Sequence, residues 1–205
     1  MASVAIAACA ASLVMTLAAC GSDTEAPSAT TSSSPVSDVF TPPAITDMAT
    51  GDSGCPTAAP ASEGAPEWTL PGVTGSVAVT GSTDTAAPQI DVNAPFSVTE
   101  TQVRTLQAGD GPVVAQTATV FVCYMGVNGR DGTVFDSSYQ SGTSVDFPLD
   151  GVIPGFQKAI AGQKVGSTVA VAMTSADGYA DGQPSAGIQP GDTLIFAIKI
   201  LDASR

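Results

Sequence analysis

Alternation of hydrophobic and polar residues is the main structural signal in the second half of the chain. Residues 76–80 and 89–93 alternate with a period of two, which is typical of half-buried strands. Residues 119–124, 169–173 and 193–201 are rich in β-branched and aromatic residues, which strands favour. On the last of these segments one face is expected to carry Leu194, Phe196, Ile198 and Ile200. The pattern predicts a β domain.

Turn signals and one helical stretch divide this domain. A Gly-Asp-Gly-Pro turn at residues 109–112 follows a candidate first core strand at residues 97–106. Residues 128–132 contain two glycines that are free to take positive φ, so they predict a tight reversal. Pro154 opens a short helix that Gly162 ends. We therefore expect a β domain interrupted by one helix, with the pair of strands at residues 76–93 as an addition before it.

The amino end is hydrophobic and is followed by a polar segment. Residues 4–19 are almost wholly apolar, too short a run to span a bilayer comfortably but long enough for the core of a signal peptide. The small residues before Cys20 resemble a bacterial lipobox, which implies cleavage after residue 19 and a lipid anchor, including palmitate, on Cys20. The alternative is an ordinary secretory signal. No Lys or Arg precedes Arg104, so we expect the true start codon to lie a few codons upstream.

Residues 20–67 are rich in Ser, Thr, Pro and Ala. Such a composition buries too little apolar surface to offset the entropy of ordering, so a disordered tether is predicted. About 140 residues then remain, which is enough for one domain with a real core. We assign residues 68–96 to accessory strands and residues 97–205 to the main domain.

The charge and the absence of histidine exclude several functions. The chain has 19 acidic residues, six basic residues and no His, with a net charge of −13. So acidic a protein is a poor candidate for binding nucleic acid or anionic lipid headgroups. Without His, Ser-His-Asp catalysis is excluded, and no metal site is expected.

The four cysteines separate by position. Cys9 would be removed with the signal peptide, and Cys20 would be lipidated. Cys55 and Cys123 remain as an even pair in an oxidising compartment. Their spacing leaves open either a disulfide or two free thiols, with Cys123 as a small buried hydrophobe.

Aromatic residues and one carboxylate recur in the predicted β domain. They occur in three blocks: Val-Cys-Tyr-Met-Gly at residues 122–126, Gly-Thr-Val-Phe-Asp-Ser-Ser at residues 132–138 and Val-Ile-Pro-Gly-Phe at residues 152–156. Such residues suggest a small apolar pocket with a few fixed polar points. With Asp-Gly-Tyr at residues 177–179 and Thr-Leu-Ile-Phe at residues 193–196, these blocks resemble, in order and spacing, the FKBP family of peptidyl-prolyl cis-trans isomerases. The resemblance covers residues 106–202, about half of the chain.

The resemblance implies an α+β fold, an antiparallel β half-barrel wrapped over one short helix. It also implies catalytic roles for Tyr124, Asp136 and Tyr179. The implied substrate-binding residues are Phe135, Val152, Ile153, Phe156, Ile188 and Phe196, with Phe156 as the floor beneath the proline ring and Ile188 in a loop covering the site. From the residues alone, without the motif, the favoured interpretation of Phe135, Phe156 and Phe196 is that they are plain core residues of a β domain.

Three departures from the family pattern bear on activity. Phe156 stands where the family usually has Trp, and Val145 stands where another aromatic residue is usual. The loop around Tyr179 reads Gly-Tyr-Ala instead of Ala-Tyr-Gly. A smaller wall at Val145 and a Phe floor are expected to weaken the pocket, and the missing glycine is expected to change the aim of the Tyr179 hydroxyl.

Together, the lipobox-like amino end and the FKBP resemblance imply an exported bacterial, and more specifically actinobacterial, lipoprotein that isomerises X-Pro bonds in exported proteins outside the cytoplasmic membrane. Its expected partners are proline-containing polypeptides and macrolides of the tacrolimus and rapamycin type, with no cofactor, and it is expected to be a monomer. The alternative is a proline-binding or chaperone-like module with little catalysis. An isomerase assay on a proline peptide would separate the two.

Overall fold

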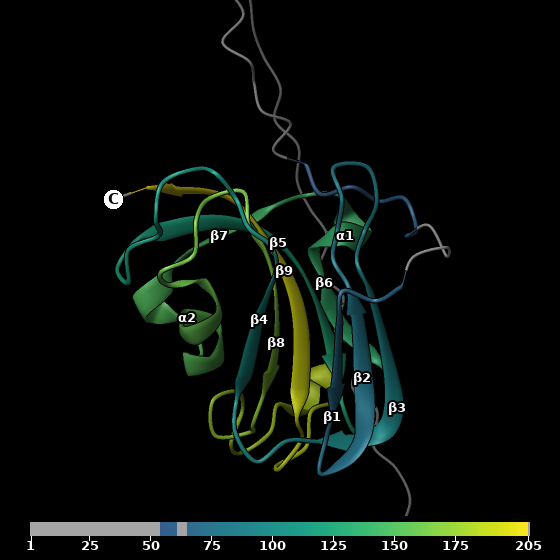
Figure 1. The fold of residues 1–205 in the computed structure, drawn as a ribbon. Coiled ribbons are helices and arrows are strands. Elements are labelled where there is room, and N and C mark those ends of the chain that lie inside the picture. The colour runs from purple at the N-terminus through teal and green to yellow at the C-terminus, as the bar shows by residue number, and fades with distance from the viewer. Residues whose placement is uncertain (1–53, 61–64, 205) are drawn as a thin grey trace, which may run out of the picture. The chain divides into compact units, whose positions relative to one another are not determined.

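A computed structural model describes residues 54–60 and 65–204. Its centre is an antiparallel sheet with the strand order β4-β8-β9-β5-β6, and β7 also pairs with β5. The strands are β4 (Gln102–Gln107), β5 (Thr119–Asn128), β6 (Val134–Ser137), β7 (Val145–Pro148), β8 (Thr168–Met173) and β9 (Leu194–Ser204). The long strand β5 pairs with β9 along one edge, and along its other edge with β7 and then β6. This sheet lies over one main helix, which is the expected FKBP-like arrangement (Figure 1).

Helix α2 (Pro154–Ile160) covers one face of this sheet. Proline suits its first turn, because an N–H there has no partner within the helix. Gly155 allows the helix to lie close to β8, since a Cβ at this position would meet the Met173 sulfur at 2.5 Å. Gly162 follows the helix with a φ of 80°, which a residue with a side chain rarely adopts. The predicted helix therefore forms and ends as the sequence indicates.

The predicted one-sided pattern of β9 holds, and its other face is also buried. Leu194, Phe196, Ile198 and Ile200 belong to the core beneath α2. Ile195 and Ala197 point to the opposite face, where they join a second hydrophobic core. A strand buried on both faces reads as a continuous apolar run, which is why residues 194–198 carry no polar side chain.

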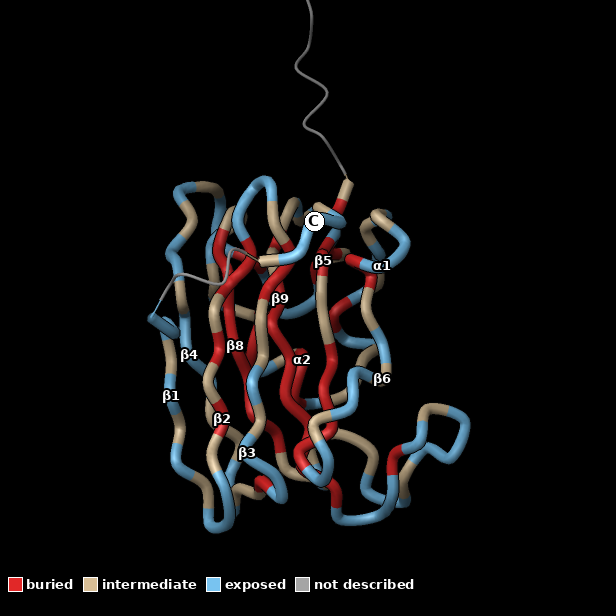
Figure 2. The backbone as a smooth tube through the Cα atoms, turned by 90° about the vertical axis from the view of Figure 1, so that its right-hand side faces the viewer, coloured by how far each residue is buried: buried red, intermediate tan, exposed pale blue. Residues whose placement is uncertain are grey.

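A three-stranded antiparallel sheet covers that opposite face. It consists of β1 (Trp68–Pro71), β2 (Thr74–Thr80) and β3 (Gln89–Ser97), in that order. Val77, Val79 and Phe96 pack on Ile195 and on a group of alanines in β8 and β9 whose small side chains permit close contact: Ala170, Ala172 and Ala197. The views in Figures 1 and 2 show the resulting three layers, with α2 on one side of the main sheet and β1–β3 on the other. The accessory strands expected at residues 76–80 and 89–93 lie within β2 and β3.

The connection from β5 to β6 is a tight turn. Residues 128–132 make the predicted reversal, in which the Asn128 N–H donates to the Thr133 carbonyl at 2.9 Å and Gly132 has a φ of 76°. Three one-turn helices occur elsewhere: α1 (Ser138–Ser141), η1 (Leu149–Gly151) and η2 (Pro184–Ala186). The first core strand predicted at residues 97–106 forms as β4, but it begins later than expected, because Ser97 ends β3 and β4 begins only at Gln102. The chain bends between them at Thr99 and Glu100.

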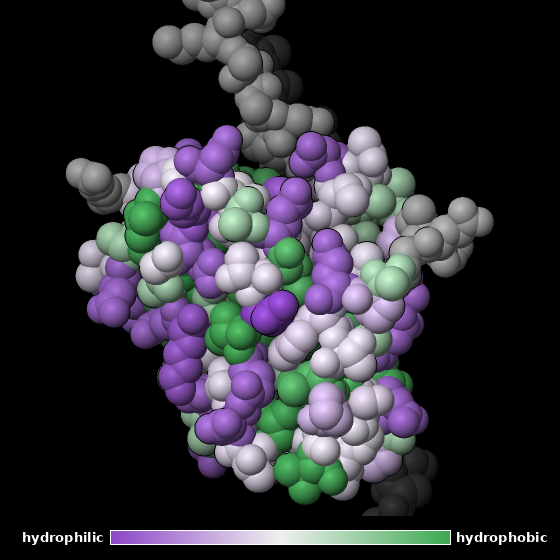
Figure 3. Space-filling model, viewed as in Figure 1, coloured by the Kyte–Doolittle hydropathy of each residue, from purple (hydrophilic) through white to green (hydrophobic). Residues whose placement is uncertain are grey.

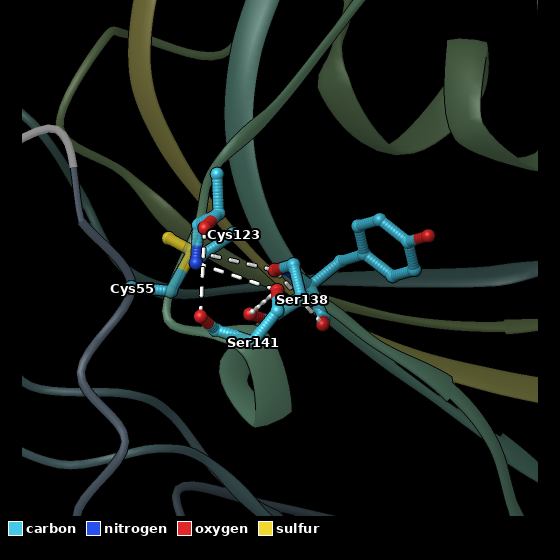
Figure 4. The surroundings of a disulfide bond; sticks show 6 residues. Cys55, Cys123, Ser138 and Ser141 are labelled. Carbon is cyan, nitrogen blue, oxygen red and sulfur yellow. Dashed lines mark hydrogen bonds between the residues drawn. A yellow bond between two sulfur atoms is a disulfide. The ribbon is translucent and has the colours of Figure 1, made fainter.

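Residues 54–60 form a strap along the main domain, although the sequence analysis assigns them to the tether. A disulfide joins Cys55 to Cys123 on β5, so the structure contains the bridged alternative. The Cys55 N–H donates to the Gly142 carbonyl at 3.1 Å, and the Ala87 N–H donates to the Ala58 carbonyl at 2.9 Å. Figure 4 shows Ser138 beside the disulfide, with its hydroxyl 3.3 Å from the Cys55 sulfur. The strap is therefore joined to the main domain by a disulfide and by backbone hydrogen bonds.

The predicted signal peptide, Cys9 and the expected lipidation site at Cys20 lie outside the described residues. Within the described ranges, no helix is both long and apolar enough to cross a bilayer. Among the residues that the structure describes, Val73 and Val113 are the most exposed large hydrophobic ones, at 68% and 64%. On the face seen in Figure 3, hydrophobic areas are small and separated by hydrophilic residues. Scattered apolar residues of this kind are ordinary on a protein surface.

Candidate functional site

A cavity of about 320 Å³ opens between the start of α2 and the main sheet. Strands β5, β6, β7 and β9 supply its walls, and the loop between β8 and β9 supplies one side. The lining consists of Tyr124, Phe135, Asp136, Val145, Phe147, Gly151, Val152, Ile153, Phe156, Tyr179 and Phe196. Most of these side chains are aromatic or aliphatic, so the cavity suits an apolar group.

Phe156 lies at the centre of the aromatic cluster. Its ring meets that of Phe196 edge to face, with centroids 4.7 Å apart and planes at 85°. The rings of Tyr124 and Phe147 each have centroids 5.8 Å from that of Phe156. Edge-to-face contacts of this kind are favourable and fix ring orientation. Phe156 is only 6% exposed, so it is packed as the base of the cavity.

Gly126 on β5 makes room for two of the walls. A Cβ at this position would lie 2.6 Å from the ring of Phe196 and 2.7 Å from that of Phe135. Those two rings meet edge to face across the glycine, with centroids 5.5 Å apart. A larger residue would therefore displace both walls, which explains the glycine that follows Met125 in the strand.

Tyr124 and Asp136 form the main polar contact of the cavity. The Tyr124 hydroxyl donates to Asp136 Oδ2 at 2.5 Å. Burial, and then the hydrogen bond to the Asp136 carboxylate, raise the pKa of the Tyr124 phenol well above its ordinary value. The phenol thus stays neutral at physiological pH. Asp136 itself is exposed at the rim.

Two further polar groups face the cavity without a protein partner. The Tyr179 hydroxyl donates to no atom of the described residues, and neither does the backbone N–H of Ile153. Ile153 is the N-cap residue of α2, where backbone N–H groups commonly lack a helical acceptor. Both groups are available to a carbonyl oxygen. Within the described residues, no group of three or more His, Cys, Asp or Glu side chains could hold a metal ion.

The structure brings together all the catalytic and substrate-binding residues expected from the sequence except Ile188. That residue is 3% exposed and packs in the core that also contains Phe156 and Phe196, so it does not line the cavity. Phe147 and Gly151 also line the cavity, although the sequence does not predict them there. The alternation of Val145 and Phe147 on β7 is the signal that could have identified Phe147.

Comparisons with known proteins agree with this geometry. Residues 111–201 match the family model of the FKBP-type peptidyl-prolyl cis-trans isomerases. The chain is 38% identical over 101 residues to an FKBP-type 22 kDa peptidyl-prolyl cis-trans isomerase of Escherichia coli, covering 49% of this chain and 48% of that protein. It therefore spans about half the length of that relative. Among solved structures, FkpA from Escherichia coli has a TM-score of 0.48 and 34% identity, covering 51% of this chain and 48% of that one.

Shorter relatives are matched almost completely. An FK506-binding protein of Streptomyces anulatus is 32% identical over 117 residues, which cover 56% of this chain and 94% of that protein. A probable FK506-binding protein of Corynebacterium glutamicum is 31% identical over 118 residues, which cover 57% of this chain and 98% of that protein. With its cavity and fold, the chain belongs to the FKBP-type peptidyl-prolyl cis-trans isomerase family.

Proposed function

We propose that this chain is a peptidyl-prolyl cis-trans isomerase that binds proline on Phe156 and accelerates rotation about the preceding amide bond. The observation that carries the proposal is the buried Phe156 ring, which closes an aromatic cavity of about 320 Å³ whose free hydrogen-bond donors include the Ile153 N–H. Family membership supports the same activity.

The chemistry requires no nucleophile. Rotation about an amide must cross a barrier of ~18–20 kcal/mol of lost resonance. In the twisted amide the carbonyl oxygen carries less charge, so water stabilises it less than it stabilises the planar form. An apolar cavity that removes water therefore favours the twisted form, and binding this form more tightly than the planar ones accelerates rotation.

The polar groups have separate roles in this proposal. The Ile153 N–H holds a carbonyl of the bound peptide and fixes its place over Phe156. Tyr179 donates its hydroxyl to a second carbonyl. The Tyr124–Asp136 pair at the rim orients the twisting amide, and its 2.5 Å hydrogen bond keeps Asp136 in one position.

A second candidate function is proline binding with little catalysis. The observation that favours it is the smaller wall at Val145, which is 37% exposed at the cavity mouth. A wider mouth admits water, and water removes the preference for the twisted amide.

A turnover measurement separates the two functions. Residues 54–205 would be mixed in catalytic amounts with a proline tetrapeptide, and the cis-to-trans rate would be followed by a protease that cleaves only the trans form. The proposal predicts a rate that rises linearly with protein concentration. Binding of the peptide without a rate increase would select the second candidate function.

We further propose that macrolides of the tacrolimus and rapamycin type occupy this cavity. The printed name of the Streptomyces anulatus relative supports the idea, because that protein is described as FK506-binding. Calorimetric titration should show one site per chain. A Phe156→Ala protein that is folded should bind at least tenfold more weakly, since a buried ring contributes ~1.5–3 kcal/mol. Equal binding would place the ligand elsewhere.

Export as a lipoprotein anchored at Cys20 remains a proposal, supported by the apolar run and the small residues before that cysteine. In this arrangement the isomerase acts on exported proteins at the outer surface of the cytoplasmic membrane. Fractionation and mass spectrometry should find the wild-type protein in the membrane with a lipid on Cys20. A Cys20→Ser variant should be released or remain unprocessed, and a soluble, unmodified wild-type protein would contradict the proposal.

A further inference from the structure

Asp177 lies two residues before Tyr179, where the chain leaves β8 and enters the loop beside the cavity. Its side chain is only 18% exposed. One of its carboxylate oxygens, Oδ2, accepts hydrogen bonds from the Thr101 hydroxyl and from the Lys158 ammonium, the latter at 2.6 Å. The carboxylate therefore joins the loop to two other elements, the entry to β4 and helix α2.

The backbone of Asp177 adds a third connection. Its carbonyl accepts the Gly155 N–H at 2.8 Å. Gly155 immediately precedes Phe156, so the first turn of α2 is fixed directly against the loop that carries Tyr179. Lys158 lies one turn later on the same helix.

Thr101 closes the network around the exit of β8. Its hydroxyl donates to Asp177 and accepts the Thr174 N–H at 3.3 Å. Thr174 in turn accepts the N–H groups of Asp177 and Gly178 through its carbonyl, at 3.1 and 3.0 Å. These hydrogen bonds fix residues 174–178, the segment that leads to Tyr179.

The charge state of Asp177 is consistent with this geometry. The hydrogen bond from Lys158, and then that from Thr101, lower the pKa of the Asp177 carboxyl. It is therefore ionised at neutral pH, when the ion pair is complete. Lys158 is 55% exposed, so its attraction to Asp177 is screened by water and is modest.

We propose that Asp177 is a positioning residue that sets the location of Tyr179 in the cavity, by holding the loop to α2 through Lys158 and to β4 through Thr101. The proposal rests on the isomerase function proposed above, in which Tyr179 contacts the substrate. Asp177 lies directly before the Gly-Tyr-Ala segment that carries this tyrosine.

A double-mutant cycle between Asp177 and Tyr179 tests the proposal in the full chain. Asp177→Asn keeps the size of the side chain and removes its charge. It should lower kcat/KM about two- to tenfold, the effect of one impaired hydrogen bond. In a Tyr179→Phe background the same change should cause no further loss, because Asp177 acts only through the Tyr179 hydroxyl. Equal losses in both backgrounds would overturn the proposal.

Asp181→Asn is the matched control. Asp181 lies two residues after Tyr179 on the same loop, is exposed, and makes no hydrogen bond or ion pair to another described residue. The same removal of charge at this position should leave kcat/KM unchanged. A loss equal to that of Asp177→Asn would indicate a general effect of loop charge and would contradict the proposal.

Lys158→Gln provides a second variant that leaves the fold intact, since Lys158 is more than half exposed. It should reproduce part of the Asp177→Asn loss, again only when Tyr179 is present. If it has no effect while Asp177→Asn lowers activity in both backgrounds, the carboxylate supports the fold and not Tyr179.

A readout without turnover separates this proposal from the proposed function. The ring of Tyr179 can be followed by NMR with fluorotyrosine, assigned through the Tyr179→Phe variant. Asp177→Asn should shift or broaden this resonance, and Asp181→Asn should not. If the wild type shows no isomerase activity but the resonance responds in this way, the positioning role stands and the enzymatic function fails. An unchanged resonance would refute the positioning role.

Discussion

The Tyr124 hydroxyl donates a hydrogen bond to Asp136 Oδ2 at 2.5 Å, from one strand to the next across the mouth of the cavity. Tyr124 lies on β5 and Asp136 on β6, where Asp136 pairs with Gly126. The contact thus fixes the distance between two walls and points the carboxylate at the place proposed for the twisting amide.

Replacing Asp136 by Asn should lower kcat/KM by a factor of about two to twelve, because one hydrogen bond contributes ~0.5–1.5 kcal/mol net. The fold should be retained, since Asp136 is exposed. Asp146→Asn is the matched control. Asp146 is an exposed carboxylate between two lining residues, Val145 and Phe147, but it is not itself in the lining. A tenfold loss of kcat/KM in Asp146→Asn would show that the loss in Asp136→Asn comes from the change in overall charge.

Tyr124 and Tyr139 should lose their protons at a higher pH than an ordinary tyrosine. Burial raises the pKa of Tyr139 to about 12, although the neighbouring Ser82 hydroxyl opposes the shift. Burial and Asp136 also raise the pKa of Tyr124. The chain has three tyrosines, so a Tyr179→Phe protein contains only these two. It should show almost no tyrosinate absorbance at pH 10, the ordinary pKa of a tyrosine phenol.

The raised pKa values of Tyr124 and Tyr139 also determine how the stability of the fold depends on pH. A phenol whose pKa is raised by folding contributes stability that is complete below pH 10 and is lost as the pH rises through the folded-state value. Unfolding titrations between pH 9 and about 12 should therefore show falling stability. Replacing Asp136 by Asn should lower the pKa of Tyr124 and increase absorbance at pH 10. An unchanged titration would contradict the hydrogen bond.

Removing the disulfide should destabilise the domain without removing its activity. The bridge joins two cysteines 68 positions apart in the sequence, for which the chain-entropy model gives about 4 kcal/mol. A Cys55→Ser, Cys123→Ser protein should lose about 2–4 kcal/mol of unfolding free energy in urea. Its folded form should keep its isomerase activity, because the Ser138 hydroxyl still accepts the Tyr124 N–H at 2.9 Å. Complete loss of activity in a folded protein would assign the bridge a direct role in the site.

Much of the fold could be predicted because local patterns agreed with tertiary burial. Strands β8 and β9 have apolar runs, and the start and end of α2 are marked by Pro154 and Gly162. Strand β1 was not predicted, because four residues containing a proline carry little periodicity. Strand β6 was missed for a similar reason, since its four residues owe their pairing to β5.

The aromatic residues in several separate blocks predict most of the candidate site. Which residues line the cavity also depends on tertiary contacts. Ile188 was expected over the cavity, but its side chain turns into the core with Phe156. The loop around it is held by Arg130, which donates to the Gly187 carbonyl at 3.0 Å and pairs with Asp192. Such contacts between distant segments have no local signature. The same holds for the network around Asp177.

Phe156 is the residue on which the account depends most. The direct measurement is the rate of cis/trans exchange in a proline peptide at equilibrium, followed by NMR with catalytic amounts of residues 54–205. Phe156→Ala should lose most of the acceleration, because it removes the ring beneath the proline. The change costs ~3–5 kcal/mol of stability, so circular dichroism must show that the variant is folded.

Phe121→Ala serves as the control in the same experiment, because Phe121 is a 37% exposed phenylalanine on β5 that does not line the cavity. The account predicts wild-type exchange rates for Phe121→Ala and nearly uncatalysed rates for folded Phe156→Ala. Full acceleration by folded Phe156→Ala would contradict the account and place the chemistry outside this cavity.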